Sequence, residues 1–420
     1  MALIDGNNFY VACEQSIDPS LIGRPIVVLS NNDGCIIARS SEARELGILM
    51  GQPYFKARRE LERLGVVVLS SNYELYGDIS QRLMKILTIH CEQIEIYSID
   101  EAFAHINRPF DYNLRPWARQ LRALIHQHLG IAIAIGIGSS KGQAKIANHI
   151  AKTIATHSGI FDLSIINDKD LLLKDIDVKH VWGAGRQLAL WCQKRGIKTA
   201  LQLRDMPNNE LHAQFGVTGT RLQHELRGET CLPLKVVASK KQQTCVSRSF
   251  GRPITSLEEL QQAVSSHVIR AGEKLRQQKQ QAKAITVFTN TSPFSQSFNH
   301  QSATAELNIP SNNTTVLLKT SLILTRKIFR PYQLLVKAGV IMGKLQSTDQ
   351  LQLTLFANHS AEEEQRSKLL MQTIDNLNKR YGNGTISWAI SILNKSWDVR
   401  REQLSYTNTT HINKIPIVYS

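Results

Sequence analysis

Three acidic residues in this 420-residue chain stand where short apolar segments end or begin. Asp5 closes the run ALID, and the adjacent Asp100 and Glu101 stand in YSIDEAF. Carboxylate oxygens are the ligands that hard cations such as Mg²⁺ prefer. Two such ions, about 3.5–4 Å apart, can stabilise both the attacking and the leaving oxygen of a phosphoryl transfer. If the fold brings the three carboxylates together, this pattern predicts a phosphoryl-transfer enzyme that uses two Mg²⁺ ions.

The segments around these acids follow the order β-α-β-β-α-β. In such a ferredoxin-like sheet the third strand lies antiparallel beside the first, so Asp5 is expected to meet Asp100 and Glu101 at one edge. Successive strand side chains point to opposite faces, so both members of the pair cannot be ideal ligands unless the turn twists. The expected elements are a strand at 2–5, the helix NNFYVACEQ, paired strands at 94–98 and 101–106, the helix DYNLRPWARQLRALIHQHL and a buried strand at 131–137.

The rest of the chain reads as further domains, which predicts an α+β multidomain protein. An insert at roughly 20–75 holds three apolar strand segments with helices between them, and residues 166–232 read as short helices. The polar run ASKKQQ (238–243) looks like a linker. Residues 244–350 alternate strands with two helices, and a weakly patterned tail closes the chain.

Composition narrows the class of protein. With 42% hydrophobic and 20% charged residues the chain has an ordinary globular composition, and no run approaches the ~20 apolar residues of a membrane helix. A strand that begins at residue 2 leaves no room for a signal peptide, so we expect a cytoplasmic protein. The six cysteines form no CxxC pair, which favours reduced thiols. A net charge of +15 points to a polyanionic partner, with membrane binding as the weaker alternative.

Tyr10 follows Asp5 by five residues, on the helix that leaves the acidic edge. It is either a core aromatic or a flat ring beneath an incoming sugar, where a 2′-hydroxyl would clash. Asn8 and Phe9 could offer backbone N–H groups at that helix start to an anionic phosphate. This segment therefore has both a structural and a nucleotide-binding interpretation.

Two cations could contact a triphosphate. Arg44 stands in SSEARELG, within the insert, and Lys152 in KIANHIAK, on the helix after the last sheet strand. Surface cations on helices are common, but these two flank the acidic edge. Lys145 and His149 could serve instead.

Two further segments could contact nucleic acid. In VWGAG, Gly183 and Gly185 can adopt positive φ and let backbone N–H groups approach a phosphate, although a plain helix-helix corner would look the same. From Lys235 to Lys283 there are ten Lys or Arg and three Glu, which suits a sheet along a phosphate backbone or a merely solvated face. The candidate DNA contacts in this basic region are Lys240, Lys241, Arg248 and Arg252.

Taken together, these segments resemble the Y-family translesion DNA polymerases, and most closely their UmuC branch. The motifs that carry the resemblance are ALIDGNNFYVACE, VVLSNNDGCIIARSSEARELG, YSIDEAF, GIGSSKGQAKIANHIAK, VWGAG, RSFG, TSPF, KAGV and QLQLTLF, in family order. The tail, with GNGT and WDVRREQLS, favours that branch over the polymerase IV branch. The resemblance covers nearly the whole chain and implies a template-directed, error-prone, lesion-bypassing DNA polymerase.

The resemblance also implies a domain plan. Its parts are a palm (1–20 and 76–165), inserted fingers (21–75), a helical, helix-hairpin-helix thumb (166–234), a linker (235–243), a DNA-gripping α+β little finger (244–350) and a tail (351–420). Within the tail, the spacing of Gln352, Leu355 and Phe356 looks like a peptide that docks into a sliding clamp, with a buried strand as the alternative.

Site roles follow from the same resemblance. Asp5, Asp100 and Glu101 would be catalytic and hold two Mg²⁺ ions, with the Gly6 carbonyl as an added ligand. Tyr10 would be the steric gate against ribonucleotides.

The triphosphate would be bound by Arg44 and Lys152. Many family members carry an aromatic hydroxyl where Ser41 stands, so the triphosphate grip would depend more on Arg44 here. Expected partners are primer-template DNA, deoxynucleoside triphosphates, a sliding clamp, a UmuD-type dimer and a RecA-type recombinase filament, with no membrane partner.

Two rival functions remain open on sequence alone. A helix-hairpin-helix, metal-dependent nuclease would cleave labelled DNA without nucleotides. A non-catalytic DNA-binding accessory subunit would tolerate replacement of Asp100 by alanine. An enzyme of the polymerase class would instead lose nearly all incorporation while still binding primer-template.

Overall fold

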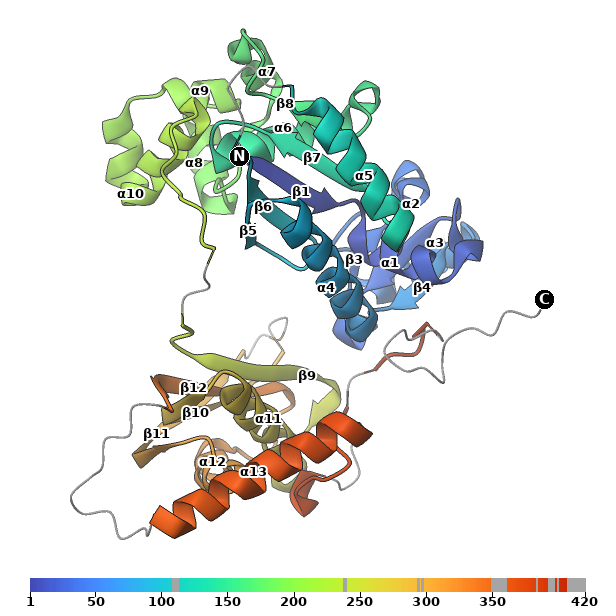
Figure 1. Ribbon diagram of the computed structural model, residues 1–420. Coiled ribbons are helices and arrows are strands. Elements are labelled where there is room, and N and C mark those ends of the chain that lie inside the picture. The colour runs from blue at the N-terminus through green and yellow to red at the C-terminus, as the bar shows by residue number, and fades with distance from the viewer. Residues whose placement is uncertain are drawn as a thin grey trace. The chain divides into compact units, whose positions relative to one another are not determined.

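Two units, each with its own apolar core, make up the chain. The computed structural model describes residues 1–107, 113–236, 240–292, 295, 298–348, 361–382, 384–391, 397–398 and 400–405. Unit 1 comprises Met1–Ala238 and Glu402–Ser420, and unit 2 comprises Ser239–Arg401 (Figure 1). All six cysteines are free thiols, and no helix in the described ranges is long and apolar enough to cross a membrane.

A five-stranded sheet, here named the palm sheet, lies at the centre of unit 1. Its strand order is β5-β6-β1-β7-β8, with β1 antiparallel to both β6 and β7. The predicted β-α-β-β-α-β order is confirmed. The strands are β1 (Ala2–Gly6), β5 (Gln93–Ile96), β6 (Glu101–His105), β7 (Ile133–Ile137) and β8 (Ile160–Asp162), and the helices beside them are α1 (Phe9–Ile17), α4 (Tyr73–His90), α5 (Arg115–Leu129) and α6 (Lys141–Thr153).

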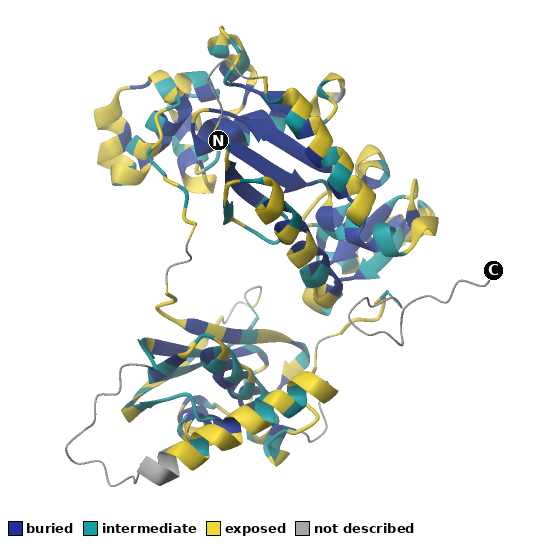
Figure 2. Cartoon of the chain, in the orientation of Figure 1, coloured by how far each residue is buried: buried dark blue, intermediate teal, exposed yellow. Residues whose placement is uncertain are grey.

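Different helices cover the two faces of the palm sheet, whose central strands are buried (Figure 2). Alternate residues of β1 point to opposite faces. Ile4 joins the core formed with α1, α4 and α5, whereas Leu3 packs with Ala144 of α6. Asp5 follows Leu3 by two positions, so its side chain shares the face that α6 covers.

Helix α6 lies directly on strand β7 because of one glycine. A Cβ atom on Gly136 would lie 2.1 Å from the backbone nitrogen of Asn148 and 2.4 Å from the carbonyl oxygen of Ala144. Real side chains do not tolerate such contacts, so only glycine permits this approach. The close packing brings the lysines of α6 within reach of the neighbouring strands β1 and β6.

A three-stranded sheet forms the fingers, in the insert between α1 and α4. Its order is β3-β2-β4, with β2 (Ile26–Leu29), β3 (Ile36–Arg39) and β4 (Val67–Ser70). Two helices complete the lobe, α2 (Ser41–Glu45) and α3 (Tyr54–Arg63). The buried Ser40 accepts a hydrogen bond from the Ala43 N–H and caps α2, which fixes the helix that carries Arg44.

A short C-terminal segment, Glu402–Ser405, binds the fingers and is named here the C-terminal strap. The Ser70 N–H donates to the Gln403 carbonyl (2.8 Å), and the Gln403 N–H donates to Ser70 Oγ (3.0 Å). The Glu402 N–H donates to Asp33 (3.0 Å), and Asn72 Nδ2 donates to Ser405 Oγ (3.2 Å). The strap therefore supplies hydrogen-bond partners to the end of β4 and to the start of α4.

Four helices form the thumb: α7 (Lys169–Asp175), α8 (Arg186–Lys194), α9 (Ala200–Asp205) and α10 (Asn208–Arg227). The buried Glu225 joins α10 to the palm. Its carboxylate accepts from the Gly142 N–H (2.8 Å) and from the Cys231 N–H (2.8 Å), and its carbonyl accepts from Ser140 Oγ (2.5 Å). These bonds hold the thumb against the N-terminus of α6.

Unit 2 contains a four-stranded antiparallel sheet of order β11-β10-β12-β9. Its elements are β9 (Thr244–Ile254), α11 (Leu257–Gln277), β10 (Gln280–Asn290), β11 (His300–Ser311), α12 (Thr314–Ile328), β12 (Leu335–Ser347) and α13 (Ala361–Tyr381). Helix α13 differs from the expected weakly patterned tail. Over residues 365–381 it is mostly exposed, with Met371 buried, and Asp375 pairs with Arg276 of α11 (2.6 and 2.8 Å), so tertiary contacts rather than an apolar stripe hold it.

Candidate active site

Two of the three predicted carboxylates stand opposite each other on adjacent strands. Asp5 at the end of β1 is the register partner of Glu101 at the start of β6. Directly opposed residues in an antiparallel pair share one face of the sheet, so both carboxylates face α6. The Gly6 N–H donates to the Asp100 carbonyl (2.9 Å), which fixes the third acid at the same edge through its backbone.

Each of these two carboxylates binds a lysine of α6. Lys152 Nζ lies 2.5 Å from Asp5 Oδ1, and Lys145 Nζ lies 2.9 and 2.8 Å from the two oxygens of Glu101. The Lys145 ammonium also lies 4.8 Å from the centre of the Tyr97 ring. Each acid of the opposed pair thus has its own lysine partner on α6.

Burial makes Asp5 a weaker acid than an ordinary aspartate. Its side chain is only 9% exposed, and burial raises its pKa to about 7, although Lys152 opposes the rise. Burial also disfavours the charged form of Glu101, but hydrogen bonds from Asp5 and Lys145 outweigh it and lower the pKa of Glu101. The Asp5 carboxylate resists ionisation even beside a lysine, so a further positive charge nearby would stabilise its charged form.

Asp100 has a different side-chain partner from the other two acids. Its carboxylate accepts a hydrogen bond from Ser98 Oγ (2.5 Å). Burial is the main cause of the raised pKa values of Tyr10 and Cys13, and the negative charge of Asp100 raises both further. Within the described ranges, no three His, Cys, Asp or Glu side chains already converge as a metal site. Asp100 lies in the bend before β6, and its carboxylate is bound by Ser98 rather than by the α6 lysines that bind Asp5 and Glu101.

A groove of about 590 Å³ lies beside the acidic edge and collects four predicted nucleotide-binding residues. Asn8 lines it from the start of α1, Ser41 and Arg44 from α2, and Lys152 from α6. Asn8 adopts a left-handed conformation (φ 46°) as the N-cap of α1. Lys152 therefore belongs both to the groove and to the carboxylate pair.

Phe9 and Tyr10 lie apart from the lining of this groove. Phe9 is a buried core residue of the palm. The Tyr10 ring is half-buried and stacks on Tyr76, with 4.5 Å between centroids and 17° between planes, and Tyr73 meets it edge-on at 6.0 Å. These neighbours hold the Tyr10 ring in one orientation.

The candidate DNA contacts occupy both units. In the thumb, Gly183 has a positive φ of 92°, whereas Gly185 is extended (φ −64°, ψ 174°) and caps α8. The Gly185 N–H donates to the Gly183 carbonyl (3.0 Å). This N–H therefore already has a backbone partner.

In unit 2, Lys240 and Lys241 are exposed on the approach to β9. Arg248 is exposed on β9. Burial lowers the pKa of Lys274 on α11, and the positive charges of Arg270 and Arg248 lower it further. Arg252 pairs with Glu259. The clamp-peptide residues Gln352, Leu355 and Phe356 lie outside the described residues.

Three residues at the site were not predicted from the sequence: Ser98, Asn7 and Arg122. Ser98 holds Asp100, and Asn7 and Arg122 line the groove. The side-chain oxygen of Asn7 is buried and, within the described ranges, has no hydrogen-bond partner. Ser98 could have been found from its place in the SIDE turn, but Arg122 is distant in sequence from every motif.

Comparison with protein families gives three matches. Residues 4–149 match the impB/mucB/samB family, and residues 241–355 match the C-terminal domain of the same family. Residues 368–418 match a domain of unknown function.

Curated relatives match over nearly the full chain. The Protein UmuC of Salmonella typhimurium is 40% identical, with 99% of each chain covered. Protein SamB of Salmonella typhimurium is 37% identical over 99% of this chain and 98% of its own. DNA polymerase IV of Bacillus velezensis is 24% identical over 98% of this chain and 95% of its own.

Solved structures show the same fold. A Y-family DNA polymerase chimera built on Dbh superposes with a TM-score of 0.65 at 20% identity, covering 82% of this chain and 99% of that one. An insertion ternary complex of Dbh DNA polymerase gives a TM-score of 0.56 with the same coverage and identity. The predicted multidomain fold, with a palm, inserted fingers, a helical thumb and a separate α+β domain, is confirmed.

Proposed function

The chain belongs to the impB/mucB/samB family, and we propose on this footing that it is an error-prone translesion DNA polymerase that extends a primer during DNA damage tolerance. It is a DNA-directed DNA polymerase, a nucleotidyltransferase with the Y-family fold. The observation that carries this proposal is Lys152, which joins the Asp5 carboxylate to a groove lined by Ser41 and Arg44. A metal-binding carboxylate and a triphosphate-binding cation are the two parts that phosphoryl transfer needs side by side.

The carboxylates fit a divalent metal. All the side-chain donors are oxygens, which suits Mg²⁺, and the raised pKa of Asp5 indicates a site that favours added positive charge. We infer that Asp5 and Glu101, with the Gly6 carbonyl, hold two Mg²⁺ ions, and that Asp100 completes the ligand set when its carboxylate turns from Ser98 toward the ions. When bound, the ions would acidify the primer 3′-hydroxyl and stabilise charge on the phosphoryl oxygens.

The lysines of α6 would then change partners. Lys152 is one-third exposed and lines the groove, so its ammonium can turn from Asp5 to phosphate oxygens. Arg44, from the fingers, would supply a guanidinium fork to the same triphosphate. Ser41 and the N–H groups of Asn8 and Phe9 would add neutral hydrogen bonds at the N-terminus of α1.

Tyr10 would select the sugar. Its ring is held by Tyr76 and Tyr73, so it cannot easily turn aside for a 2′-hydroxyl. A fixed obstacle discriminates more strongly than a mobile one, because the substrate rather than the protein must bear the clash.

DNA would be gripped through sequence-independent charge. Lys240, Lys241, Arg248 and Arg252 would contact backbone phosphates. The VWGAG turn at Gly183 and Gly185 would add a contact, for which the Gly185 N–H would exchange the Gly183 carbonyl for a phosphate oxygen. Such binding should weaken steeply with salt. Further proposed partners are a sliding clamp at Gln352, Leu355 and Phe356, a UmuD-type dimer and a RecA-type filament, all in the cytoplasm where DNA is copied.

Primer extension across a defined lesion tests the proposal. Wild type with Mg²⁺ should extend the primer past the lesion, whereas Asp100→Ala should bind primer-template and incorporate almost nothing. Cleavage of labelled DNA without nucleotides would indicate a nuclease instead. Equal damage tolerance in cells by wild type and Asp100→Ala would indicate a non-catalytic DNA-binding subunit.

A further inference from the structure

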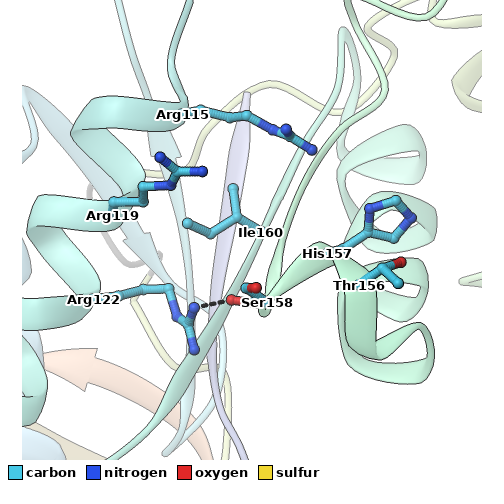
Figure 3. Close-up of a pocket in the computed structure, with 7 residues that line it drawn as sticks. All are labelled: Arg115, Arg119, Arg122, Thr156, His157, Ser158 and Ile160. Carbon is cyan, nitrogen blue, oxygen red and sulfur yellow. Dashed lines mark hydrogen bonds between the residues drawn. The ribbon is translucent and has the colours of Figure 1, made fainter.

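A second hollow, on the α5 side of the palm, is lined by arginines that the proposed polymerase chemistry does not use. It measures about 70 Å³ and lies between α5 and the turn after α6 that contains the short helix η3 (Ala155–His157) (Figure 3). Arg115, Arg119 and Arg122 come from α5, and Thr156, His157 and Ser158 face them across Ile160 of β8. We name this hollow the arginine pocket.

The three arginines share one face of α5 because they are spaced four and three residues apart. Arg122 donates from Nε to the Ile133 carbonyl (2.8 Å) and from Nη1 to the Ser158 carbonyl. Within the described part of the chain, no carboxylate forms an ion pair with any of the three. Arg115 and Arg119 are exposed at the rim of the pocket, so their guanidinium groups are free to bind an anion.

The backbone opposite α5 is shaped to receive a guanidinium. Gly159 has a φ of +74°, and a Cβ atom there would lie 2.9 Å from Cζ of Arg122. The positive φ favours glycine at this position, and without a Cβ the guanidinium lies close to the 158–159 backbone. Burial also lowers the pKa of Arg122, which indicates a charge that water solvates poorly.

The size and the donors of the pocket indicate the chemistry of a ligand. Guanidinium forks match the oxygens of a carboxylate or a phosphate, and a site with three arginines favours phosphate, which carries the larger negative charge. A volume of about 70 Å³ holds several waters, at roughly 10–15 Å³ for each probe-sized water, but leaves no room for a base and sugar. The pocket therefore suits the phosphate end of a small anion.

The arginine pocket adjoins the nucleotide groove. Arg122 lines both hollows, and Gly159, which follows the pocket residue Ser158, lines the groove. A phosphate that leaves the groove would thus meet Arg122 first and then Arg119 and Arg115. We propose that the arginine pocket binds the pyrophosphate released by nucleotide addition, on its way out of the groove. This inference rests on the proposed polymerase function.

Calorimetric titration of the full-length protein with inorganic pyrophosphate, in EDTA and without DNA, tests this proposal. Wild type should show a binding event that the double variant Arg115→Ala, Arg119→Ala weakens by roughly tenfold for each guanidinium removed. Arg63→Ala, an exposed arginine at the end of α3, is the matched control and should bind as wild type does. Arg44→Ala removes a groove cation and separates pyrophosphate bound in the groove from pyrophosphate bound in the pocket.

Two results would overturn the inference. The first is an identical pyrophosphate titration for wild type and the double variant. The second is unchanged pyrophosphate binding with weaker binding of an oligothymidine strand, which would make the pocket a contact for a nucleic-acid backbone. The binding assay needs no DNA synthesis, so primer extension by the same preparations reports separately on the proposed function.

Discussion

Replacement of Asp5 by asparagine should make the metal-free protein more stable at neutral pH while abolishing primer extension. Burial raises the pKa of Asp5 from 3.8 to about 7 in the folded protein. Between these values the unfolded chain has lost a proton that the folded protein keeps. The free energy of unfolding of wild type therefore falls as pH rises from about 4 to about 7.

The size of the effect follows from the shift. About three pKa units correspond to about 4 kcal/mol at 1.36 kcal/mol per unit, and this loss is complete above pH 7. Asparagine cannot ionise, so the Asp5→Asn protein avoids the loss. The two proteins should be about equally stable at pH 4, and the variant should gain up to about 4 kcal/mol at pH 8.

Urea unfolding at several pH values in EDTA measures the difference in the free energy of unfolding between the two proteins. Amide hydrogen exchange of peptides from β1 and β6 then shows whether the difference arises at these strands. Glu45→Gln, an exposed carboxylate on α2, is the control for loss of one charge. Added Mg²⁺ should stabilise wild type and not the variant, because the ion binds the folded carboxylates. An Asp5→Asn protein that is less stable than wild type at pH 8, or a difference that does not change with pH, would refute the reasoning.

Three further changes test other parts of the site. Tyr10→Ala should admit ribonucleotides and cost about 2 kcal/mol through its lost stacking on Tyr76, and unchanged sugar selectivity in single-nucleotide insertion assays would exclude the gate. Gly136→Ala should push α6 from β7, cost about 1–3 kcal/mol or more and lower insertion rates, whereas a wild-type melting temperature would contradict the packing argument. Gln403→Pro removes the N–H that donates to Ser70 Oγ, so hydrogen exchange at the end of β4 should accelerate, and unchanged protection would show that the strap adds no stability.

The strand order of the palm could be predicted because its segments are short, apolar and bounded by turns. The opposition of Asp5 and Glu101 followed from the antiparallel pairing. The alternation of strand side chains predicted that Asp100 and Glu101 could not both be ideal ligands, but not which of the two would have another partner. The lysine partners could not be predicted, because their reach depends on how closely α6 packs against Gly136. Local sequence does not encode that distance.

Contacts between segments distant in sequence could not be predicted from the sequence either. Helix α13 is mostly exposed and lacks a strong apolar stripe, so its sequence resembles a polar tail. The strap meets Ser70 across 333 residues through backbone groups that any sequence possesses. The arginine pocket shows its spacing in the sequence, but the facing turn and Gly159 become its neighbours only in the folded chain.

The C-terminal strap makes unit 2 an insertion within unit 1 in the topological sense. Trp397 is still buried in the core of unit 2, with its carbonyl accepting from the Gly251 N–H, and Glu402 already binds the fingers. The polypeptide therefore crosses between the units twice. A protease that nicks the first crossing would leave two fragments still joined by hydrogen bonds at the fingers, and a second cut near residue 400 would be needed to release unit 2.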